Sequence, residues 1–336
     1  MLWVVTGAAG HIGANLVRLL LDRGESVRAV VHHNTAALEG LEVETVSADV
    51  GDPESLREAF RDADIVVNLA ARISISRNAG EVVDPVNVAG TRNVVQACLE
   101  CGVLRLVHFS SIHAIAHPAA GEVTDERSPL VSGRNVAAYD RSKAEGERVV
   151  LEAADNGLDA VILAPTAVVG PYDFAPSYFG RVLLGLARRR IPVLVSGGFD
   201  WVDVRDVAAA TLRAALAEQS SGKYLLSGHW HSIMEVSRMA GTITGSPAAS
   251  FAAPMPLARF CGGAVEQMCK LTGRQPLFTA CAIDALSQHP RVSHARAAAE
   301  LGYAPRPFAE TLADTYVWFS DNGYVAGRCI RMGASA

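Results

Sequence analysis

Short apolar runs alternate with amphipathic segments through the first half of the chain. The apolar runs are rich in Val, Ile and Leu and lie at residues 2–5, 27–31, 43–47, 64–69, 104–110 and 160–164. Segments with a helical spacing of apolar positions lie between them, at residues 14–23, 53–61, 86–100 and 136–156. Strands that alternate with helices in this way predict an α/β fold, in which crossover helices cover a parallel sheet.

A glycine-rich turn follows the first apolar run at once. Residues 6–13 read TGAAGHIG, and an amphipathic segment comes directly after them. A strand, a glycine turn and a helix form the setting in which such a turn binds a dinucleotide. The glycines let the backbone approach a pyrophosphate, and the helix N-terminus supplies amide donors. The residues expected to bind the cofactor here are Gly7, Ala9, Gly10, His11, Ile12 and Gly13.

The pattern changes after Pro165, where Gly, Pro and aromatic residues gather and helix-like and loop-like segments follow. With the glycine turn, this predicts a Rossmann-type, doubly wound parallel sheet and a smaller, interleaved C-terminal substrate-binding region. The dinucleotide-binding domain is expected at residues 1–165, with 201–226 returning to it. The substrate-binding region is expected at 166–200 and 227–325, and a tail at 326–336.

Composition narrows the class of protein. The chain has 336 residues, of which half are apolar and 19% charged, as in a globular protein of one or two domains. Its net charge of −5 gives no reason to expect a nucleic-acid partner. Cys98 and Cys101 have no second pair to complete a metal site, so reduced thiols and a cytoplasmic location are expected. No signal peptide is expected, because Met1 leads straight into the first apolar run. No membrane span is expected, because prolines and charges interrupt the apolar stretch 251–271.

Tyr139 and Lys143 carry the main candidate chemistry. They are four residues apart, so they share one face if their segment is helical. A free phenol has a pKa near 10, and a nearby cation favours the phenolate and lowers that pKa. The pair therefore predicts a tyrosine that serves as a general acid or base. Two serines, Ser110 and Ser111, lie between the glycine turn and this pair.

These motifs resemble the extended short-chain dehydrogenase/reductase family over nearly the whole chain. The markers are TGAAGHIG at 6–13, ADVGD at 48–52, VNLAA at 67–71, NVAGT at 87–91, HFSSIHAI at 108–115, YDRSK at 139–143, APTAVVGPYD at 164–173, WVDVRDVA at 201–208 and LGYAPRP at 301–307. Within the family, the chain is most similar to bacterial relatives of dihydroflavonol 4-reductase, often labelled NAD-dependent epimerase/dehydratase. The resemblance implies an enzyme that binds a nicotinamide dinucleotide at the C-terminal ends of its strands.

The resemblance also implies roles for particular residues. Tyr139 would be the acid/base, and Lys143 would bind the nicotinamide ribose and tune Tyr139. Ser111 would hydrogen-bond the substrate oxygen, with Ser110 as the alternative, since two hydroxyl donors offset the charge that hydride delivery builds there. Besides Tyr139 and Lys143, the implied cofactor contacts are Asp49, Val50, Leu69, Ala70, Ala71, Asn87 and Pro165. The expected substrate contacts are Ile73, Ile112, His113, Tyr172, Phe174 and Tyr178.

Some of these residues have plain structural alternatives. Asp49 matches a position that meets the adenine, and it also suits a turn or helix cap before Pro53. Asn87 matches an asparagine behind the active site and equally suits a helix N-terminus. His113 serves either as a substrate hydrogen-bonding group or as a satisfied structural histidine.

The end of the second strand bears on the choice of cofactor. NAD-selective proteins place a carboxylate there to bind the ribose 2′-hydroxyl, whereas this chain has Val31 and then His32. A cation at this place would attract the 2′-phosphate of NADP, and bound phosphate favours a protonated histidine. NADP(H) is therefore expected to be favoured weakly over NAD(H), with an exposed histidine of no role as the alternative.

Three functions compete. The first is a reductase or dehydrogenase that acts on the carbonyl or alcohol of an apolar small molecule. The second is a nucleotide-sugar epimerase or dehydratase, and the third is a non-catalytic dinucleotide-binding regulator. A regulator needs no acid/base, so the Ser–Tyr–Lys set speaks against it.

Two departures from the family pattern speak against the epimerase or dehydratase. Dehydratases carry an Asp-Glu pair where this chain has Ile112 and His113. Epimerases commonly carry a diphosphate-binding Arg where it has Phe199, although Arg181 or Arg205 would be substitutes. The expected apolar rim, which includes Phe179 and Trp201, suits a hydrophobic ketone, aldehyde or alcohol. Family members often dimerise through helices, for which segments 86–100 and 136–156 are the candidates.

Overall fold

A seven-stranded parallel sheet forms the centre of the computed structural model, which describes residues 1–32, 34–119, 121–133, 135–191, 193–248, 251–256, 258–259 and 279–325. The expected tail at 326–336 and much of the apolar stretch 251–271 lie outside these residues. The sheet order is β10-β6-β5-β4-β1-β2-β3, and every neighbouring pair is parallel. The strands are β1 (Leu2–Thr6), β2 (Ser26–Val31), β3 (Glu44–Ser47), β4 (Ile65–Asn68), β5 (Arg105–Phe109), β6 (Ala160–Pro165) and β10 (Gly222–Leu226).

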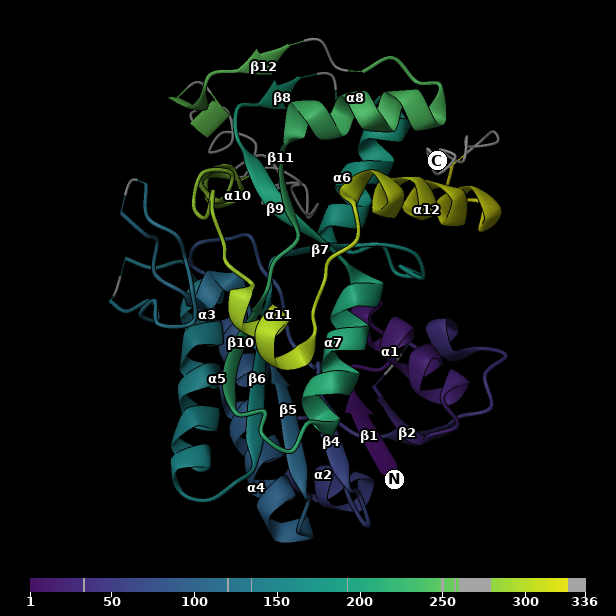
Figure 1. Cartoon of the computed structure of the whole chain (residues 1–336), viewed down its shortest axis with the longest axis vertical. Helices are drawn as coiled ribbons and strands as arrows, with labels where there is room; N and C mark the ends of the chain where they lie inside the picture. Colours follow the sequence, from purple (N-terminus) through teal and green to yellow (C-terminus); the bar gives the residue numbers. More distant parts are fainter. Residues whose placement is uncertain are drawn as a thin grey trace.

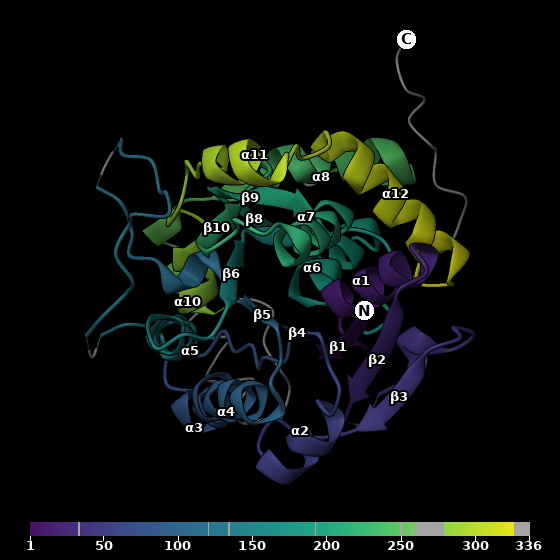
Figure 2. The ribbon, with the colours of Figure 1, turned by 60° about the horizontal axis from the view of Figure 1, so that its bottom comes forward.

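Helices cover both faces of this sheet (Figure 2). One face carries α1 (His11–Asp22), α7 (Val204–Leu216) and α11 (Ala295–Leu301). The other carries α2 (Pro53–Ala59), α4 (Thr91–Cys101) and α5 (Ala138–Asp155). This arrangement confirms the predicted doubly wound Rossmann-type fold. The order in which strands are added to the sheet reverses between β1 and β4, where such sheets open a crevice for ligands.

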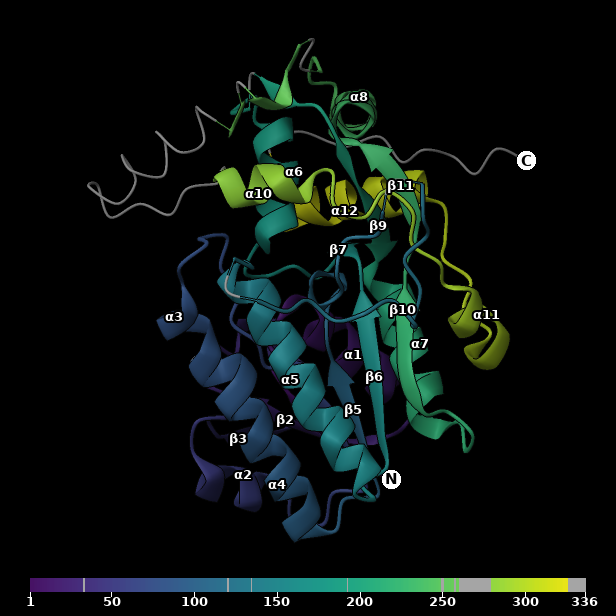
Figure 3. The ribbon, with the colours of Figure 1, turned by 90° about the vertical axis from the view of Figure 1, so that its left-hand side faces the viewer.

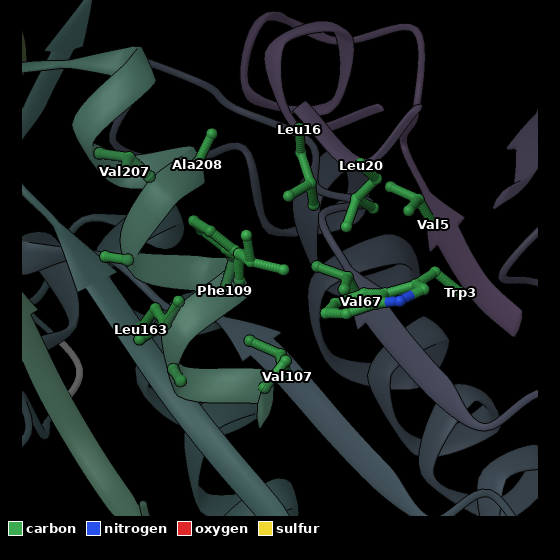
Figure 4. Packing of buried hydrophobic residues seen from close by; sticks show 14 of the residues in the cluster. Trp3, Val5, Leu16, Leu20, Val67, Val107, Phe109, Leu163, Val207 and Ala208 are labelled. Carbon is green, nitrogen blue, oxygen red and sulfur yellow. The ribbon is translucent and has the colours of Figure 1, made fainter. Parts of the chain in front are cut away.

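The core on the first face explains why the apolar runs are buried. Trp3, Val67 and Phe109 lie on the sheet, with Leu16 of α1 and Val207 of α7 packed above them (Figure 4). All five side chains are almost completely buried. Burial of a large apolar side chain stabilises a fold by about 1.5–3 kcal/mol, so this face of the sheet is a main source of stability.

The smaller region lies beyond the C-terminal ends of the strands (Figures 1 and 3). It has a three-stranded sheet of β7 (Ala167–Val169), β9 (Gly198–Asp203) and β11 (His229–Ser232), and a pair formed by β8 (Leu194–Val195) and β12 (Ala252–Ala253). Its helices are α6 (Tyr178–Ala187), α8 (Ile233–Thr244), α10 (Ala280–Ala285) and α12 (Phe308–Asp321). The chain crosses from this region back to the central sheet through α7 and β10, so the two regions interleave.

Two details differ from the expectations. Residues 201–203 belong to β9 in the smaller sheet, so the return to the central sheet starts only with α7. The segment expected to be one helix at 86–100 begins with a π-helical turn, η2 (Pro85–Gly90), that follows α3 (Gly80–Asp84). This turn packs closely against Val50, because a Cβ on Gly90 would lie 2.7 Å from Cγ2 of Val50. Local widening of a helix often marks a functional site.

Candidate active site

The glycine turn between β1 and α1 is so tight that its glycine positions leave little room for a side chain. Gly7 has a φ of 66°, which favours glycine, and its carbonyl accepts a hydrogen bond of 2.9 Å from the Gly10 amide. A Cβ on Gly13 would lie 2.4 Å from that carbonyl oxygen. Gly10 faces the neighbouring cavity and precedes α1, whose N-terminus has no side-chain cap. A bare backbone at a helix N-terminus fits the pyrophosphate of a dinucleotide.

Helix α5 presents three successive turns to the C-terminal end of β5. Tyr139 is hydrogen-bonded to Ser111, and Nζ of Lys143 donates to the Phe109 carbonyl at 2.5 Å. One turn further on, Glu147 accepts a hydrogen bond of 2.5 Å from Ser110. Helical spacing of four residues places all three side chains on one face. The structure thus brings together the catalytic residues that the sequence suggested.

The two serines have different surroundings. The Ser110 hydroxyl donates a hydrogen bond to the buried Glu147 carboxylate. The Ser111 hydroxyl oxygen accepts from the His113 amide at 3.2 Å, which starts the short helix η3 (Ile112–Ala114), and it contacts the Tyr139 phenol. Ser111 and Tyr139 therefore present two hydroxyl groups side by side at the cavity wall.

The pKa expected for Tyr139 is corrected by the structure. Burial raises the pKa of Tyr139 to about 12, and the Ser111 hydrogen bond offsets only part of that rise. The Lys143 ammonium, which was expected to lower this pKa, donates to the Phe109 carbonyl. Burial also lowers the pKa of Lys143 to about 8, while Glu147 opposes this change. With only the contacts that the protein itself provides, the Tyr139 phenol stays protonated near neutral pH.

A cavity of about 440 Å³ joins the glycine turn to the Ser111–Tyr139 pair. It lies where β1, β4, β5 and β6 end and where the smaller region begins. The expected residues that line it are Gly7, Gly10, His11, Ile12, Gly13, Leu69, Ala71, Ser111, Tyr139, Lys143 and Pro165, and, toward the smaller region, Ile73, Ile112, His113 and Tyr178. The expected cofactor residues Ala9, His32, Asp49, Val50, Ala70 and Asn87 are not part of this lining.

Two expected substrate contacts lie elsewhere, which is a correction. Tyr172 and Phe174 do not line the cavity; their rings stack on one another at 6.3 Å and lie under the guanidinium of Arg18. Phe174 also packs edge-on against Trp318 of α12 at 5.1 Å. Trp201, expected on the rim, is fully buried in the core of the smaller region. Their partners come from segments far away in the sequence, which local patterns do not reveal.

Asn87 supports the site from behind. Its amide donates 2.8 Å to the Ser142 hydroxyl and 2.9 Å to the Arg72 carbonyl, and its oxygen accepts 2.8 Å from the Arg72 amide. The side chain is buried within the π-helical turn. Asn87 thus ties the loop after β4 to α5, the helix that carries Tyr139.

A histidine and a carboxylate flank the phenol. Nδ1 of His113 lies 3.4 Å from the buried Asp140 carboxylate, and its ring packs edge-on against Tyr139 at 5.8 Å. Burial raises the pKa of Asp140. On the opposite wall, burial together with His113 and His117 lowers the pKa of His289 to about 3. His113 lines the cavity, and its buried Nδ1 has no hydrogen-bond partner among the described residues, so the alternative of a satisfied structural histidine is not supported.

Sequence reasoning missed several residues of this site. Gln288 and His289 line the cavity but lie between the markers at 201–208 and 301–307, in a stretch that carries no motif. Glu147 was missed although its position four residues after Lys143 was a usable signal. In the part of the chain that the structure describes, no cluster of His, Cys, Asp and Glu is placed to hold a metal ion. Nor is any helix in that part long and apolar enough to cross a membrane.

Comparisons with known proteins agree with this geometry. The model of the NAD dependent epimerase/dehydratase family matches residues 3–226. "Sterol demethylase protein B" of Methylococcus capsulatus is 36% identical over 331 residues, which are 97% of this chain and all of that protein. "Putative dihydroflavonol 4-reductase" of Synechocystis is 32% identical and covers 96% of this chain and 95% of its own length.

Solved structures share the fold. That of gox2253 has a TM-score of 0.84 at 29% identity, covering 96% of this chain and 99% of its own. UDP-glucose 4-epimerase of Thermus thermophilus, solved in complex with NAD, has a TM-score of 0.75 at 25% identity over 95% of this chain and 99% of its own. With the matched family model and the two full-length relatives, the chain belongs to the NAD-dependent epimerase/dehydratase family, within the extended short-chain dehydrogenases/reductases.

Proposed function

We propose that this chain is a nicotinamide-dinucleotide-dependent oxidoreductase that reduces the carbonyl of an apolar small molecule. The observation that carries the proposal is the pair of adjacent hydroxyl groups on Ser111 and Tyr139, at one cavity with the glycine turn. The bound dinucleotide supplies the hydride. Ser111 and Tyr139 hydrogen-bond the carbonyl oxygen as negative charge develops on it, and Tyr139 then gives that oxygen its proton.

The protonation state of Tyr139 suits the proton-donor role that carbonyl reduction requires. A phenol with a pKa near 12 is a proton donor at neutral pH and not a base. Lys143 donates to the Phe109 carbonyl and is influenced by the negative charge of Glu147. We expect it to bind the nicotinamide ribose and to keep a positive charge beside the phenol. Alcohol oxidation by the same site would require the phenol to lose its proton first.

The charge of the cavity wall supports an uncharged, apolar substrate. Among the described residues that line it, Lys143 is the single lysine or arginine, whereas Asp140, Asp173 and Asp200 also face it. Arg205, considered as a diphosphate ligand, is bound instead to Asp203 and Asp314 at 2.7 Å each. Arg181 is exposed and does not line the cavity.

Apolar side chains take the corresponding place in this wall. Phe199 packs edge-on against Phe179 at 5.0 Å, and both face the cavity. A buried diphosphate without cations would cost several kcal/mol, whereas hydrocarbon gains about 25 cal/mol per Å² on burial. The names of the two full-length relatives point the same way, since sterols and dihydroflavonols are bulky ring systems.

Sugar nucleotides are therefore expected not to bind. Calorimetry with UDP- and dTDP-hexoses should give no micromolar affinity, while a panel of polycyclic and aryl ketones should be reduced at the expense of NADPH or NADH. Phe199→Arg is the matched variant, since it restores a cation where epimerases commonly have one and should strengthen UDP binding. Micromolar binding of a UDP-hexose to the unmodified protein, with release of its C4 epimer, would favour an epimerase instead.

We propose that any preference for NADP(H) over NAD(H) is small. Nε2 of His32 lies 3.0 Å from the Asp49 carboxylate, and both side chains are about half exposed. A 2′-phosphate beside His32 would therefore also face a negative charge. Asp49 keeps a turn role as well, because it accepts from the Gly51 amide at 2.7 Å.

Asp49→Asn should raise the ratio of NADPH affinity to NADH affinity by about two- to fivefold, as fits an exposed charge pair of about 0.2–1 kcal/mol. The asparagine oxygen keeps the hydrogen bond to Gly51. His32→Ala should lower the same ratio. Fluorescence titration of both dinucleotides measures this affinity ratio in each protein. An unchanged ratio in both variants would show that His32 and Asp49 take no part in recognising the 2′-phosphate.

A further inference from the structure

Lysine is rare in this chain. Lysine and arginine together number 30, but only Lys143, Lys223 and Lys270 are lysines. Lys270 lies outside the described residues. Both others are buried, with exposures of 5% and 9%; Lys223 contacts one carboxylate, and Lys143 lies one helical turn before the residue that carries it. Burying two ammonium groups is costly unless they are paired, so this arrangement calls for a reason.

Glu147 is that carboxylate, and both of its oxygens are engaged. The side chain is 1% exposed; Oε2 accepts from Ser110 at 2.5 Å, and Oε1 lies 3.1 Å from Nζ of Lys223 on the edge strand β10. The Lys223 side chain is 10% exposed. The pair connects α5 to the ends of two strands of the central sheet.

The contacts of Lys143 and Glu147 fall on consecutive residues. Lys143 binds the carbonyl of Phe109, Glu147 binds the hydroxyl of Ser110, and the next residue is Ser111. Movement of either α5 side chain would therefore move the peptide that carries the substrate-binding hydroxyl. Displacements of about 1 Å at such a place can cost about 10²-fold in rate.

We infer that Glu147, held in place by Ser110 and Lys223, is a positioning residue that provides the counter-charge for the Lys143 ammonium. Burial lowers the pKa of Lys143, and the negative charge of Glu147, one helical turn further along α5, opposes that change. The other groups around Lys143 add none: His108 on β5 is buried and its pKa is well below the ordinary value, and Tyr139 is neutral. Lys223 lies 3.1 Å from Oε1 of Glu147 and so fixes the direction of that carboxylate.

This role predicts a definite order of Lys143 titration midpoints. Removing the negative charge removes what raises the pKa of Lys143, so Glu147→Gln should lower the midpoint from about 8 by about one pH unit. The glutamine oxygen still accepts from Ser110. Lys223→Met removes a positive charge and should leave the midpoint unchanged or higher. The double variant Glu147→Gln/Lys223→Met should fall between Glu147→Gln and the unmodified protein.

NMR of the full chain labelled with ¹³C at lysine Cε measures these midpoints directly. Three lysines give three signals, and Lys223→Met and Lys270→Arg assign them. Thermal unfolding of each variant checks that it is folded. An unchanged midpoint in Glu147→Gln, or a fall in Lys223→Met as large as that in Glu147→Gln, would overturn the inference, since a purely structural role loosens the site in both variants alike.

The inference rests on the proposed function only in the role it gives Lys143, and the two can fail separately. The predicted order of midpoints without any ketone reduction would keep the counter-charge and remove the reductase. Ketone reduction with midpoints that do not follow the order would keep the reductase and remove the counter-charge. If the reductase function and the counter-charge role both hold, the pH above which the reduction rate falls should be lower in Glu147→Gln than in the unmodified protein.

Discussion

Tyr139→Phe is expected to lower the turnover of ketone reduction by about 10²–10⁴-fold, the usual worth of a positioned general acid. The phenylalanine ring keeps the packing against His113, so the loss isolates the hydroxyl. Dinucleotide affinity should stay nearly the same, because the glycine turn is untouched and Lys143 keeps its bond to the Phe109 carbonyl.

Steady-state kinetics and dinucleotide titration on the purified variant measure the two effects. Tyr172→Phe is the matched control, since Tyr172 packs against Arg18 outside the cavity and should retain near-normal turnover. Near-normal turnover in Tyr139→Phe would remove Tyr139 from proton transfer. A loss in Tyr172→Phe comparable with that in Tyr139→Phe would restore Tyr172 to the substrate site.

Ser111→Ala is expected to lower turnover by about 10²–10³-fold, as the loss of one preorganised donor to a developing oxyanion does. Ser110→Ala provides a comparison one residue away. Its hydroxyl is bound to Glu147 and does not contact the substrate, so its loss should cost less turnover than the loss of Ser111 and should also lower stability, because Glu147 loses a partner.

The comparison of the two serine variants tests the assignment by the ratio of their turnover rates. Single-turnover measurements with saturating dinucleotide separate the chemical step from binding. Equal losses in both variants, or a larger loss in Ser110→Ala, would show that Ser111 is not the serine that contacts the substrate.

The fold was predictable because its signals are local. Six strands of the central sheet were expected as apolar runs, and the observed strands agree with them within about one residue at each end, whereas β10 was expected only as part of the returning segment 201–226. Helix α1 begins at His11, earlier than expected, because the turn from Gly7 to Gly10 closes within the motif. The π-helical turn at 85–90 was not predictable, since it depends on contacts with Val50, Arg72 and Ser142 that lie far away in sequence.

The site was predictable to the extent that its residues share one motif or one helix face. Tyr139 and Lys143 are one turn apart, so their joint position follows from spacing alone. The pKa of Tyr139 did not follow, because it depends mainly on burial by residues that lie far away in the sequence. The places of Tyr172 and Phe174 depend on Arg18 and Trp318, which no local pattern connects to them.

Transfer of deuterium from 4-deuterated dinucleotide tests the proposed reaction most directly. The unmodified protein, supplied with each stereoisomer of the deuterated NADPH or NADH and the ketone panel, should give an alcohol that carries one deuterium on the former carbonyl carbon, from one isomer only. Tyr139→Phe should give little of it. Mass spectrometry of the product reads the result. Absence of deuterated alcohol from every ketone, together with epimerisation of a sugar nucleotide without net consumption of dinucleotide, would contradict the assignment of a carbonyl reductase.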